Sequence, residues 1–479
     1  MPHTPTQDDW LTWMSSTEKA ALIRKGDISP RELVDHAIAR IERLNPVVNS
    51  VIYPRFEEAR AQADDVGLLP DGPLRGVPFL IKDIQQTVEG WPYSWGWKLL
   101  KDRGVKGEFT GAVLRRFFDA GLITLGQTTV PELGPSSTTE TRAWGATRNP
   151  WDPSRIVGGS SGGAGASVAA GFVSLAHGND AGGSIRIPAT CNGLVGLKPS
   201  RGRSSLGPAY HAIWNHSGEE GVLTRTVRDA AVGLDIIRGP GPGDLYHAPE
   251  PQRPYVDEVG ADPGRLRVGL LNEALFGHAL DREVTSAVDL CARLLEDQGH
   301  QVAPGWPSAM ADPGLPGQVL MVMGAAQAAT VGGFEKRFGI TVSEEELAPH
   351  VWQLVQLGRA TTAEQYLGFD TWRNDVTRRI ALWFEESGSD LLLMPALTQP
   401  APRLTGGGSP EGLTAFMPQA NFTGLPAMTL PVAVNAAGIP VSAQLMARYG
   451  REDVLFRVAA QLEEAVRWDE RHPSFDWAQ

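Results

Sequence analysis

The sequence predicts an α/β fold in which a mixed central β-sheet is surrounded by α-helices. Short apolar runs such as "VPFLI" and "AMTLPVAV" are typical of buried strands. Segments with the 3.6-residue periodicity of amphipathic helices lie between these runs. The Pro/Gly-rich stretches 239–243 and 404–412 are interpreted as surface loops rather than as linkers between domains.

The first element that the pattern predicts is a helix that begins after Ser29. Ser29 is a suitable N-cap, Pro30 fits the first helical position, and Glu32 completes a capping box. Apolar residues then recur on one face, and we expect Asn45-Pro46 to end the helix. The residues of that face are Leu33, Val34, Ala37, Ile38 and Ile41.

The following segments alternate between helix and strand. Residues 56–65 predict a second helix, and residues 74–84 predict a buried strand that ends at Lys82. Residues 111–129 predict a helix, a stop at Gly121 and a further strand.

The segment 147–204 is dense in glycine and small residues. Residues 164–171 can form a tightly packed helix, and "FVSLAHGND" resembles a buried strand that runs into a glycine turn. Further on, residues 265–304 predict a strand–helix–strand unit. The C-terminal part predicts the strands 389–397, 427–434 and 440–447 and the helix 451–466.

The composition is typical of a globular protein and does not favour binding to polyanions. The chain has 479 residues, of which 42% are hydrophobic and 20% charged, and its net charge is −12. This acidity does not favour binding to nucleic acid or to anionic membrane surfaces. No run approaches the ~18 apolar residues of a membrane span, and the N-terminus lacks a signal-peptide pattern. We therefore expect a cytoplasmic protein.

No metal or redox centre is predicted. Cys191 and Cys291 are too few for a disulfide framework and are expected to be buried small hydrophobes. The ten histidines are scattered, without an HExxH motif or a paired Cys/His spacing. We expect no cofactor.

Two serines in glycine-rich stretches are candidate nucleophiles. Ser161 lies at the centre of a G-x-S-x-G match within "IVGGSSGGAG", but the preceding residues form a poor strand for a nucleophile elbow. Ser184 follows a buried apolar strand, and the turn Ala181, Gly182, Gly183 and Ser184 can direct successive backbone N–H groups at one point. Such a turn predicts an oxyanion hole. His177 is expected at the start of this turn, without a clear role as a base.

Lys82 is the candidate base. It ends the apolar strand, where burial disfavours the ammonium form and lowers the pKa of the side chain. To act near neutral pH its pKa must fall by about 3 units, which costs about 4 kcal/mol. A salt-bridged lysine at a strand end remains the alternative interpretation.

Three separated blocks resemble the amidase signature family of hydrolases. They are "GVPFLIKD", "GGSSGGAG" and "NDAGGSIRIPA" followed by "GLVGLKPS". The helix near the start and the segments 421–432 and 438–447 are also similar to the family, so the resemblance extends over essentially the whole chain. It implies one domain over residues 1–479, with no cofactor and a small-molecule amide or carbamate substrate.

The resemblance also implies an organisation of this domain. N-terminal helices occupy about 1–65, a core with the catalytic motifs about 70–235, a variable substrate wall about 240–410, and a C-terminal sheet and helix about 411–479. A monomer or a homodimer is expected.

The resemblance further implies a serine–cis-serine–lysine triad. Ser184 corresponds to the nucleophile, Ser160 to the cis-serine and Lys82 to the base. Ser161, Asp180 and Arg186 then correspond to supporting residues around the turn.

Substrate preference is less closely defined. "AWGATRNPWD" and "HGNDAGGS" are similar to the family's bacterial branch that acts on cyclic nylon oligomers, and aryl-acylamidases and urethane-cleaving amidases are similar in type. We expect small apolar or aryl amides, with carbamates as a further class. An amidotransferase amidase subunit, an esterase and a non-catalytic binding protein of the same fold are the alternatives.

Candidate substrate contacts lie in three segments. "VEGWPYSWGWK" places Trp91 and Trp95, with Tyr93 and Trp97, soon after Lys82, where they form either an apolar mouth or ordinary packing. Val130 and Pro131, with Glu132, and the segment 320–338 are further candidates. The apolar segment 318–334 is expected to be a wall of the pocket or an ordinary buried helix.

Overall fold

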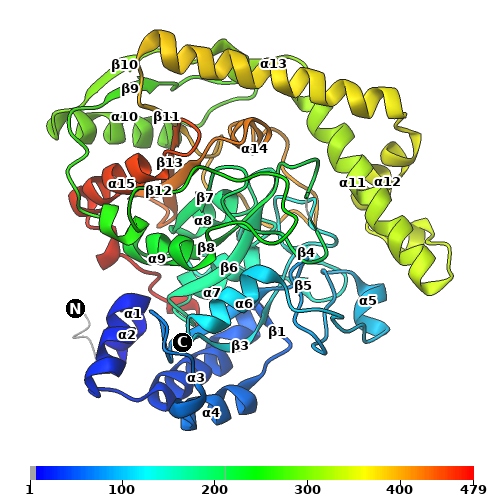
Figure 1. Cartoon of the computed structure of the whole chain (residues 1–479), viewed down its shortest axis with the longest axis vertical. Coiled ribbons are helices and arrows are strands. Elements are labelled where there is room, and N and C mark those ends of the chain that lie inside the picture. The colour runs from blue at the N-terminus through cyan, green and yellow to red at the C-terminus, as the bar shows by residue number, and fades with distance from the viewer. Residues whose placement is uncertain (1–6, 211, 479) are drawn as a thin grey trace.

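The computed structural model describes residues 7–210 and 212–478, and in this part eleven strands form one mixed sheet (Figure 1). The predicted α/β class is confirmed. Across the sheet the strands follow the order β1 (Val51–Ile52), β3 (Ile123–Thr128), β2 (Pro78–Lys82), β6 (Leu175–Asp180), β8 (Glu219–Thr224), β7 (Val195–Lys198), β12 (Ala427–Val434), β13 (Pro440–Ala447), β11 (Leu391–Pro395), β9 (Arg267–Leu270) and β10 (Gln301–Pro304).

The sheet combines two parallel groups of strands with an antiparallel middle and an antiparallel edge strand, β1. Strands β3, β2 and β6 are parallel to one another, as are β11, β9 and β10. The strands from β6 to β11 in the sheet order pair antiparallel. Every predicted strand forms, and β6 extends through Asp180, so His177 lies within the strand rather than at the start of the turn.

The N-terminal helices are α1 (Gln7–Trp13), α2 (Ser16–Lys25), α3 (Pro30–Val48) and α4 (Phe56–Asp64). Helix α3 begins with the predicted capping box of Ser29 and Glu32 but ends at Val48, beyond the predicted stop. Pro46 is tolerated because it lies in the last turn. There the side chain of Asn45 continues the hydrogen bonding, since its Oδ1 accepts the N–H groups of Ser50 and Val51 at 2.9 Å. Residues 1–6, part of the N-terminus that lacks a signal-peptide pattern, lie outside the described residues.

Two apolar clusters cover the two faces of the sheet. Successive side chains of β2 point to opposite faces, so Phe79 and Ile81 join one cluster and Leu80 joins the other. The first cluster packs beneath α9 (Val227–Ile237), α10 (Arg282–Asp297) and α15 (Glu452–Val466), and the second packs beneath α3 and α7 (Gly162–Ala169). Burial on both faces explains why the β2 sequence is an uninterrupted apolar run up to Lys82.

Three long helices stand outside the sheet: α11 (Leu315–Phe338), α12 (Pro349–Ala360) and α13 (Ala363–Ser387) (Figure 1). Phe334 of α11 makes edge contacts with Trp95 and Trp97, at ring distances of 5.4 and 5.9 Å, and thereby connects α11 to the loop after β2. The remaining short elements are α5 (Lys98–Asp102), α6 (Ala112–Asp119), α8 (Arg186–Asn192), α14 (Pro418–Thr423) and the hairpin of β4 (Glu140–Thr141) and β5 (Gly145–Ala146).

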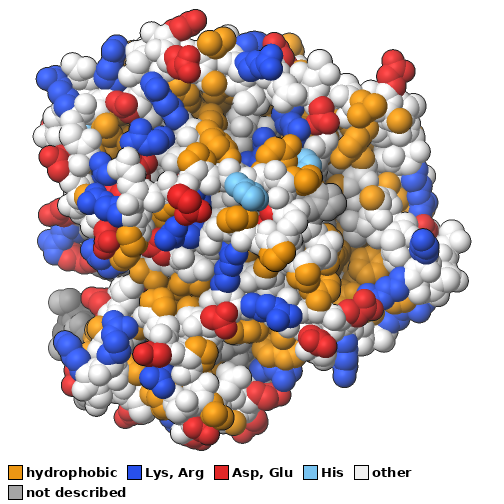
Figure 2. Space-filling model, viewed as in Figure 1, with side chains coloured by type: hydrophobic (Ala, Val, Ile, Leu, Met, Phe, Trp, Pro, Cys, Tyr) orange, Lys and Arg blue, Asp and Glu red, His pale blue; other side chains and the backbone are white. Residues whose placement is uncertain are grey.

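Charges of both signs are mixed over the visible surface. On the face drawn in Figure 2, Lys and Arg side chains lie among Asp, Glu and hydrophobic side chains, without a broad area of one sign. Within residues 7–210 and 212–478, none of the helices combines the length and the apolar character needed to cross a bilayer.

The contact between α7 and β3 yields a test of the fold. A Cβ on Gly163 would lie 2.4 Å from the backbone N of Thr129, so Gly163→Ala must push α7 away from the sheet. We expect the free energy of unfolding to fall by about 1–3 kcal/mol. The control is Gly368→Ala in α13, where a Cβ meets nothing within 4 Å. It should stabilise the protein by up to about 1 kcal/mol. Chemical denaturation of both variants measures the difference, and equal stabilities would contradict the packing.

Candidate active site

Lys82 ends β2 as a fully buried side chain with polar contacts. Its Nζ donates to Ser160 Oγ at 2.9 Å and to Asn179 Oδ1 at 2.5 Å, and it lies 3.3 Å from the carbonyl oxygen of Asn179. Burial lowers the pKa of Lys82 to about 7, although the negative charges of Glu220 and Asp180 act in the opposite direction. Much of the lysine is therefore neutral at neutral pH, with a lone pair available to accept a proton.

Ser160 and Ser161 lie in the loop that leads into α7. The peptide bond between Gly159 and Ser160 is cis. Ser161 connects this loop to β6 and to the Ser184 turn, because its Oγ donates to the carbonyl of Asn179 and its N–H donates to the carbonyl of Ser184. The residue after Ser160 therefore links the lysine side of the site to the Ser184 side.

Ser184 lies in the turn between β6 and α8, and its side chain borders a cavity. Gly183 has a φ of +118°, a region open to glycine, and a Cβ there would lie 2.8 Å from the side chain of Met417. The Gly183 N–H donates to Asp180 Oδ1 at 2.6 Å. One of the four predicted oxyanion donors is thus committed to a structural bond. Ala181, Gly182 and Ser184 remain the candidates.

Asp180 and Arg186 brace the turn from within the protein. Arg186 Nε donates to Asp180 Oδ2 at 2.9 Å, and both side chains are fully buried. Burial by itself would raise the pKa of Asp180, but the charge and hydrogen bonds of Arg186 and the amide of Asn421 hold it well below its usual range. Arg186 also donates to Gln444 Oε1 at 2.7 Å. Segments more than 230 residues away in sequence therefore fix the Ser184 turn.

A cavity of about 600 Å³ opens in front of Ser184. Its inner wall includes Gly159, Gly182 and Ser184, and its outer wall includes Leu320 of α11 and Leu357 of α12. Trp214 covers the turn, since a Cβ on Gly182 would lie 3.2 Å from its ring. A substrate carbonyl in this cavity can therefore approach both Ser184 and the turn amides.

A second cavity, of about 820 Å³, lies beyond Trp214, which borders both spaces. Trp95, Tyr210 and Phe334 give its wall an aromatic character. Helix α11 borders both cavities, so the segment 318–334 forms the predicted apolar wall as a helix.

The other candidate substrate contacts lie elsewhere. Trp91 packs against the main core and beneath Arg55, whose Cζ is 4.1 Å from the ring centroid. Val130 is fully buried within the cluster that supports Trp95, and Pro131 contributes backbone contacts behind Gly96. Among the four candidates Trp91, Trp95, Val130 and Pro131, Trp95 is the residue that borders one of these two cavities.

Asp83 positions Trp95. Its buried carboxyl accepts the N–H of Ser94 at 3.0 Å and the hydroxyl of Ser94 at 2.5 Å, which fixes the loop after β2. Burial raises the pKa of Asp83 to about 7. Asp83, which fixes the loop that carries Trp95, therefore directly follows Lys82 at the end of β2.

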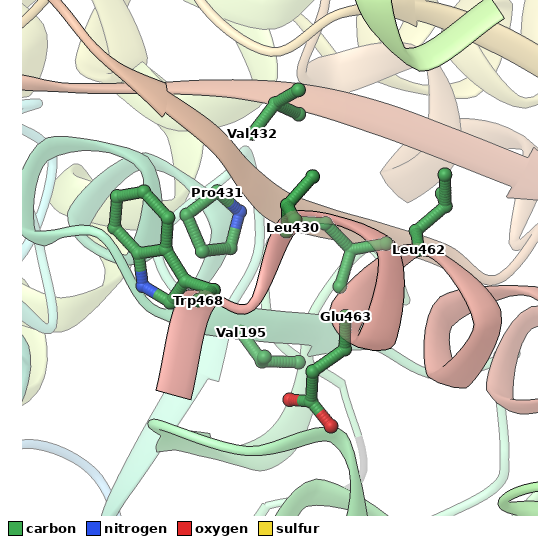
Figure 3. Close-up of a pocket in the computed structure, with 8 residues that line it drawn as sticks. Val195, Leu430, Pro431, Val432, Leu462, Glu463 and Trp468 are labelled. Carbon is green, nitrogen blue, oxygen red and sulfur yellow. The ribbon is translucent and has the colours of Figure 1, made fainter. Parts of the chain in front are cut away.

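A third pocket is too small to bind a substrate. It lies between β7, β12 and α15 and is lined by apolar residues and Glu463 (Figure 3). Its volume of about 10 Å³ is close to that of one water-sized probe. It lies apart from Lys82, Ser160 and Ser184, none of which lines it.

The structure adds site residues that the sequence did not indicate. Asn179 holds Lys82 and donates through Nδ2 to Gln85 Oε1 at 2.9 Å. His177 and Glu220 form a buried pair behind the lysine, at 2.7 Å. The position of Asn179, next to Asp180, was a signal that could have identified it, whereas Glu220 stands in a β8 sequence without a motif.

The cysteines and acidic groups form no metal centre in the described part of the chain. No group of three or more His, Cys, Asp or Glu side chains in residues 7–210 and 212–478 is arranged to hold a metal ion. Burial raises the pKa of Cys191 and of Cys291 to about 12, so both remain thiols near neutral pH.

Comparison with known proteins finds relatives that are named as amidases or hydrolases. The family described as Amidase matches residues 32–456. A 6-aminohexanoate-cyclic-dimer hydrolase of Pseudomonas sp. strain NK87 is 38% identical over 480 residues, covering 96% of each chain. A solved structure of 6-aminohexanoate cyclic dimer hydrolase superposes with a TM-score of 0.91 at 37% identity, covering 97% of this chain and 99% of that one. A bacterial aryl acylamidase superposes with a TM-score of 0.86 at 26% identity, covering 96% and 98% of the two chains.

The burial of Lys82 yields a prediction about stability. The unfolded lysine binds a proton below pH 10.5, whereas the folded one does so only below about pH 7. Between these values the wild-type free energy of unfolding gains a contribution that rises with pH, on the order of 4 kcal/mol in total. Lys82→Met removes this contribution while keeping the volume of the side chain.

We therefore expect Lys82→Met to be more stable relative to wild type at pH 7 than at pH 10.5. Urea denaturation of both proteins at several pH values measures the difference. The comparison with wild type cancels the other titrating groups. A constant difference between the two proteins would contradict a lowered pKa.

Proposed function

The chain belongs to the amidase family, and from that premise we propose that it hydrolyses small apolar or aryl amides through Ser184, Ser160 and Lys82. The enzyme class is that of amidases, hydrolases that act on carbon–nitrogen bonds other than peptide bonds. The observation that carries the proposed roles is the 2.9 Å contact between Lys82 Nζ and Ser160 Oγ. A buried lysine with a pKa of about 7 in contact with a serine is a competent general base.

Acylation begins with two proton transfers. Neutral Lys82 takes the proton of Ser160 as Ser160 takes the proton of Ser184, and Ser184 Oγ attacks the substrate carbonyl carbon. The negative charge then develops on the carbonyl oxygen. The backbone N–H groups of Ala181, Gly182 and Ser184 are the proposed donors to it, each contributing about 3–4 kcal/mol when well aimed. The N–H of Gly183 serves instead to hold the turn on Asp180.

Collapse of the tetrahedral intermediate breaks the carbon–nitrogen bond. The Lys82 ammonium returns its proton through Ser160 to the leaving nitrogen, which departs as a neutral amine. Water then attacks the ester formed with Ser184. It gives its proton to the same relay, and the carboxylic acid is released with Ser184 restored.

The two cavities support the proposed substrate class. Apolar side chains of α11 and α12 border the Ser184 cavity, and aromatic side chains border the adjoining one. These walls suit apolar or aryl groups on either side of the reacting bond. We extend the proposal to carbamates because they react through the same tetrahedral chemistry. A monomer or homodimer in the cytoplasm remains the expectation.

Substitution of the three residues tests the roles. Ser184→Ala should lower kcat on the order of 10⁶-fold because no acyl-enzyme forms. Lys82→Ala and Ser160→Ala should each lower it by about 10²–10⁴-fold, with the smaller loss for Ser160→Ala. Steady-state kinetics with a chromogenic anilide, with melting curves as the folding control, measures these effects. Full activity of Lys82→Ala would refute the scheme.

The pKa of Lys82 predicts the pH dependence. The base acts in its neutral form, so kcat/KM should rise with pH and level off above a midpoint near pH 7. A rate profile from pH 5 to 9 with the same anilide measures the midpoint. A midpoint above pH 9 would assign the lysine an ordinary, unperturbed basicity and contradict its role.

A substrate panel separates the alternatives. Anilides, aryl carbamates, esters and glutamine should be compared with Ser184→Ala as the blank. Turnover of anilides or carbamates supports the proposal, and ester-dominant turnover indicates an esterase. Turnover of glutamine alone, or copurification of a partner subunit, would indicate an amidotransferase subunit.

A further inference from the structure

The ring of His177, rather than a backbone carbonyl, accepts the hydrogen bond of the Lys82 backbone N–H. Strands β2 and β6 pair at Leu80 and Ala176. Two residues further along β2, the N–H of Lys82 donates to the ring Nδ1 of His177 at 3.3 Å. The other ring nitrogen of His177 lies 2.7 Å from Glu220 Oε2. Lys82, His177 and Glu220 are all fully buried, so water does not screen the interactions among them.

The hydrogen bonds indicate where the ring proton of His177 resides. A backbone N–H donates, so Nδ1 of His177 accepts, and the proton of a neutral imidazole resides on Nε2, which donates to Glu220. His177 therefore carries no positive charge to neutralise Glu220. The other oxygen of Glu220, Oε1, has no hydrogen-bond partner among the described residues. Among the described residues, Glu220 thus has no cationic side chain in contact with it.

Within residues 7–210 and 212–478, Lys82 has no charged side chain in contact with its Nζ. Its Nζ touches the hydroxyl of Ser160 and the amide and carbonyl oxygens of Asn179, which are neutral. Strand β3 and helix α7, which pack against β2, carry no titratable side chain in "ITLGQT" and "GGAGASVA". Helix α3 also packs against β2 and carries charged side chains, but the charges that act on Lys82 are those of Glu220 and Asp180. When Lys82 takes up a proton, its stabilising countercharge must therefore come from groups that it does not touch.

Two carboxylates are available, and they differ in what already neutralises them. Asp180 is paired with Arg186 at 2.9 Å, so that pair has no net charge. Glu220 is bonded to a neutral histidine, and its charge raises the pKa of Lys82 more than that of Asp180 does. Asp83, next in sequence, directs its carboxyl at Ser94 instead.

We infer that Glu220, held by His177, is the countercharge of the Lys82 ammonium and a positioning residue for the reaction. This inference rests on the proposed function. In acylation the proton leaves Ser160 and arrives on Lys82 Nζ, and the charge of Glu220 stabilises the ammonium formed there. In the next step the proton returns through Ser160 to the leaving nitrogen. Glu220 itself neither gains nor loses a proton.

The test is Glu220→Gln, which keeps the shape and an acceptor for His177 but removes the charge. Without the negative charge the pKa of Lys82 falls, so the acidic limb of the pH profile should move to lower pH by about one unit. The plateau rate should fall up to about tenfold because the lysine becomes a weaker base. The melting temperature should stay equal or rise, since a buried carboxylate with an unpaired oxygen is removed. A merely structural role predicts lower stability and an unmoved limb.

Two matched variants separate charge from packing. His177→Gln keeps an acceptor for the Lys82 N–H and the charge of Glu220, so its limb should stay near that of wild type. Glu463→Gln removes a half-buried carboxyl group outside the site, and it should not move the limb. If Glu220→Gln does not melt cooperatively, the pair His177→Phe with Glu220→Leu carries the same test. Replacement of both partners by apolar groups is better tolerated than removal of one.

The readout is the rate at which a fluorophosphonate labels Ser184, followed by intact mass from pH 5 to 9, because it requires no knowledge of the substrate. If wild type is not labelled, the proposed function itself fails. If wild type is labelled and the acidic limb of the Glu220→Gln profile coincides with that of wild type, the inference alone is overturned. A downward shift in that variant, absent from His177→Gln and Glu463→Gln, supports it.

Discussion

The removal of Lys82 from water is the constraint on which the rest of the site depends. An ammonium in that position has neutral contacts, Ser160 and Asn179, and burial brings its pKa to about 7. The cost, on the order of 4 kcal/mol, is met by the apolar packing of β2 on both faces. The proposed base is thus a lysine that the surrounding sheet is stable enough to hold out of water.

The turn that carries Ser184 depends on a second buried interaction of opposite character. Asp180 and Arg186 are also fully buried, but they neutralise each other and are bonded further to Asn421 and Gln444. This network is rigid because each partner has several bonds, and its loss would leave a charge unpaired in the interior. The site therefore combines a lysine, Lys82, whose charge is disfavoured by burial with an ion pair, Asp180 and Arg186, that is stabilised by direct contact.

The proposed catalytic residues and the outer cavity walls lie in different parts of the chain. Strands β2 and β6 and the loop before α7 hold Lys82, Ser160 and Ser184, whereas α11 and α12 border the cavities outside them. The contact of Phe334 with Trp95 joins the two parts. The outer walls can therefore vary in shape without changing the contact between Lys82 and Ser160.

The sequence by itself determined the fold class, eight of the eleven strands in the main sheet, and the three residues of the proposed relay, because apolar periodicity and three local motifs encode them. It did not predict β1, β7 and β8, nor helices such as α9, α12 and α13. It misplaced the end of α3, since the Asn45 side chain that compensates for Pro46 acts only in the folded chain. Only the tertiary structure decided that Trp95 rather than Trp91 borders a cavity, that Gly183 binds Asp180, and that His177 and Glu220 stand behind Lys82. These features arise from contacts between strands and loops distant in sequence, where no local pattern specifies which side chains meet.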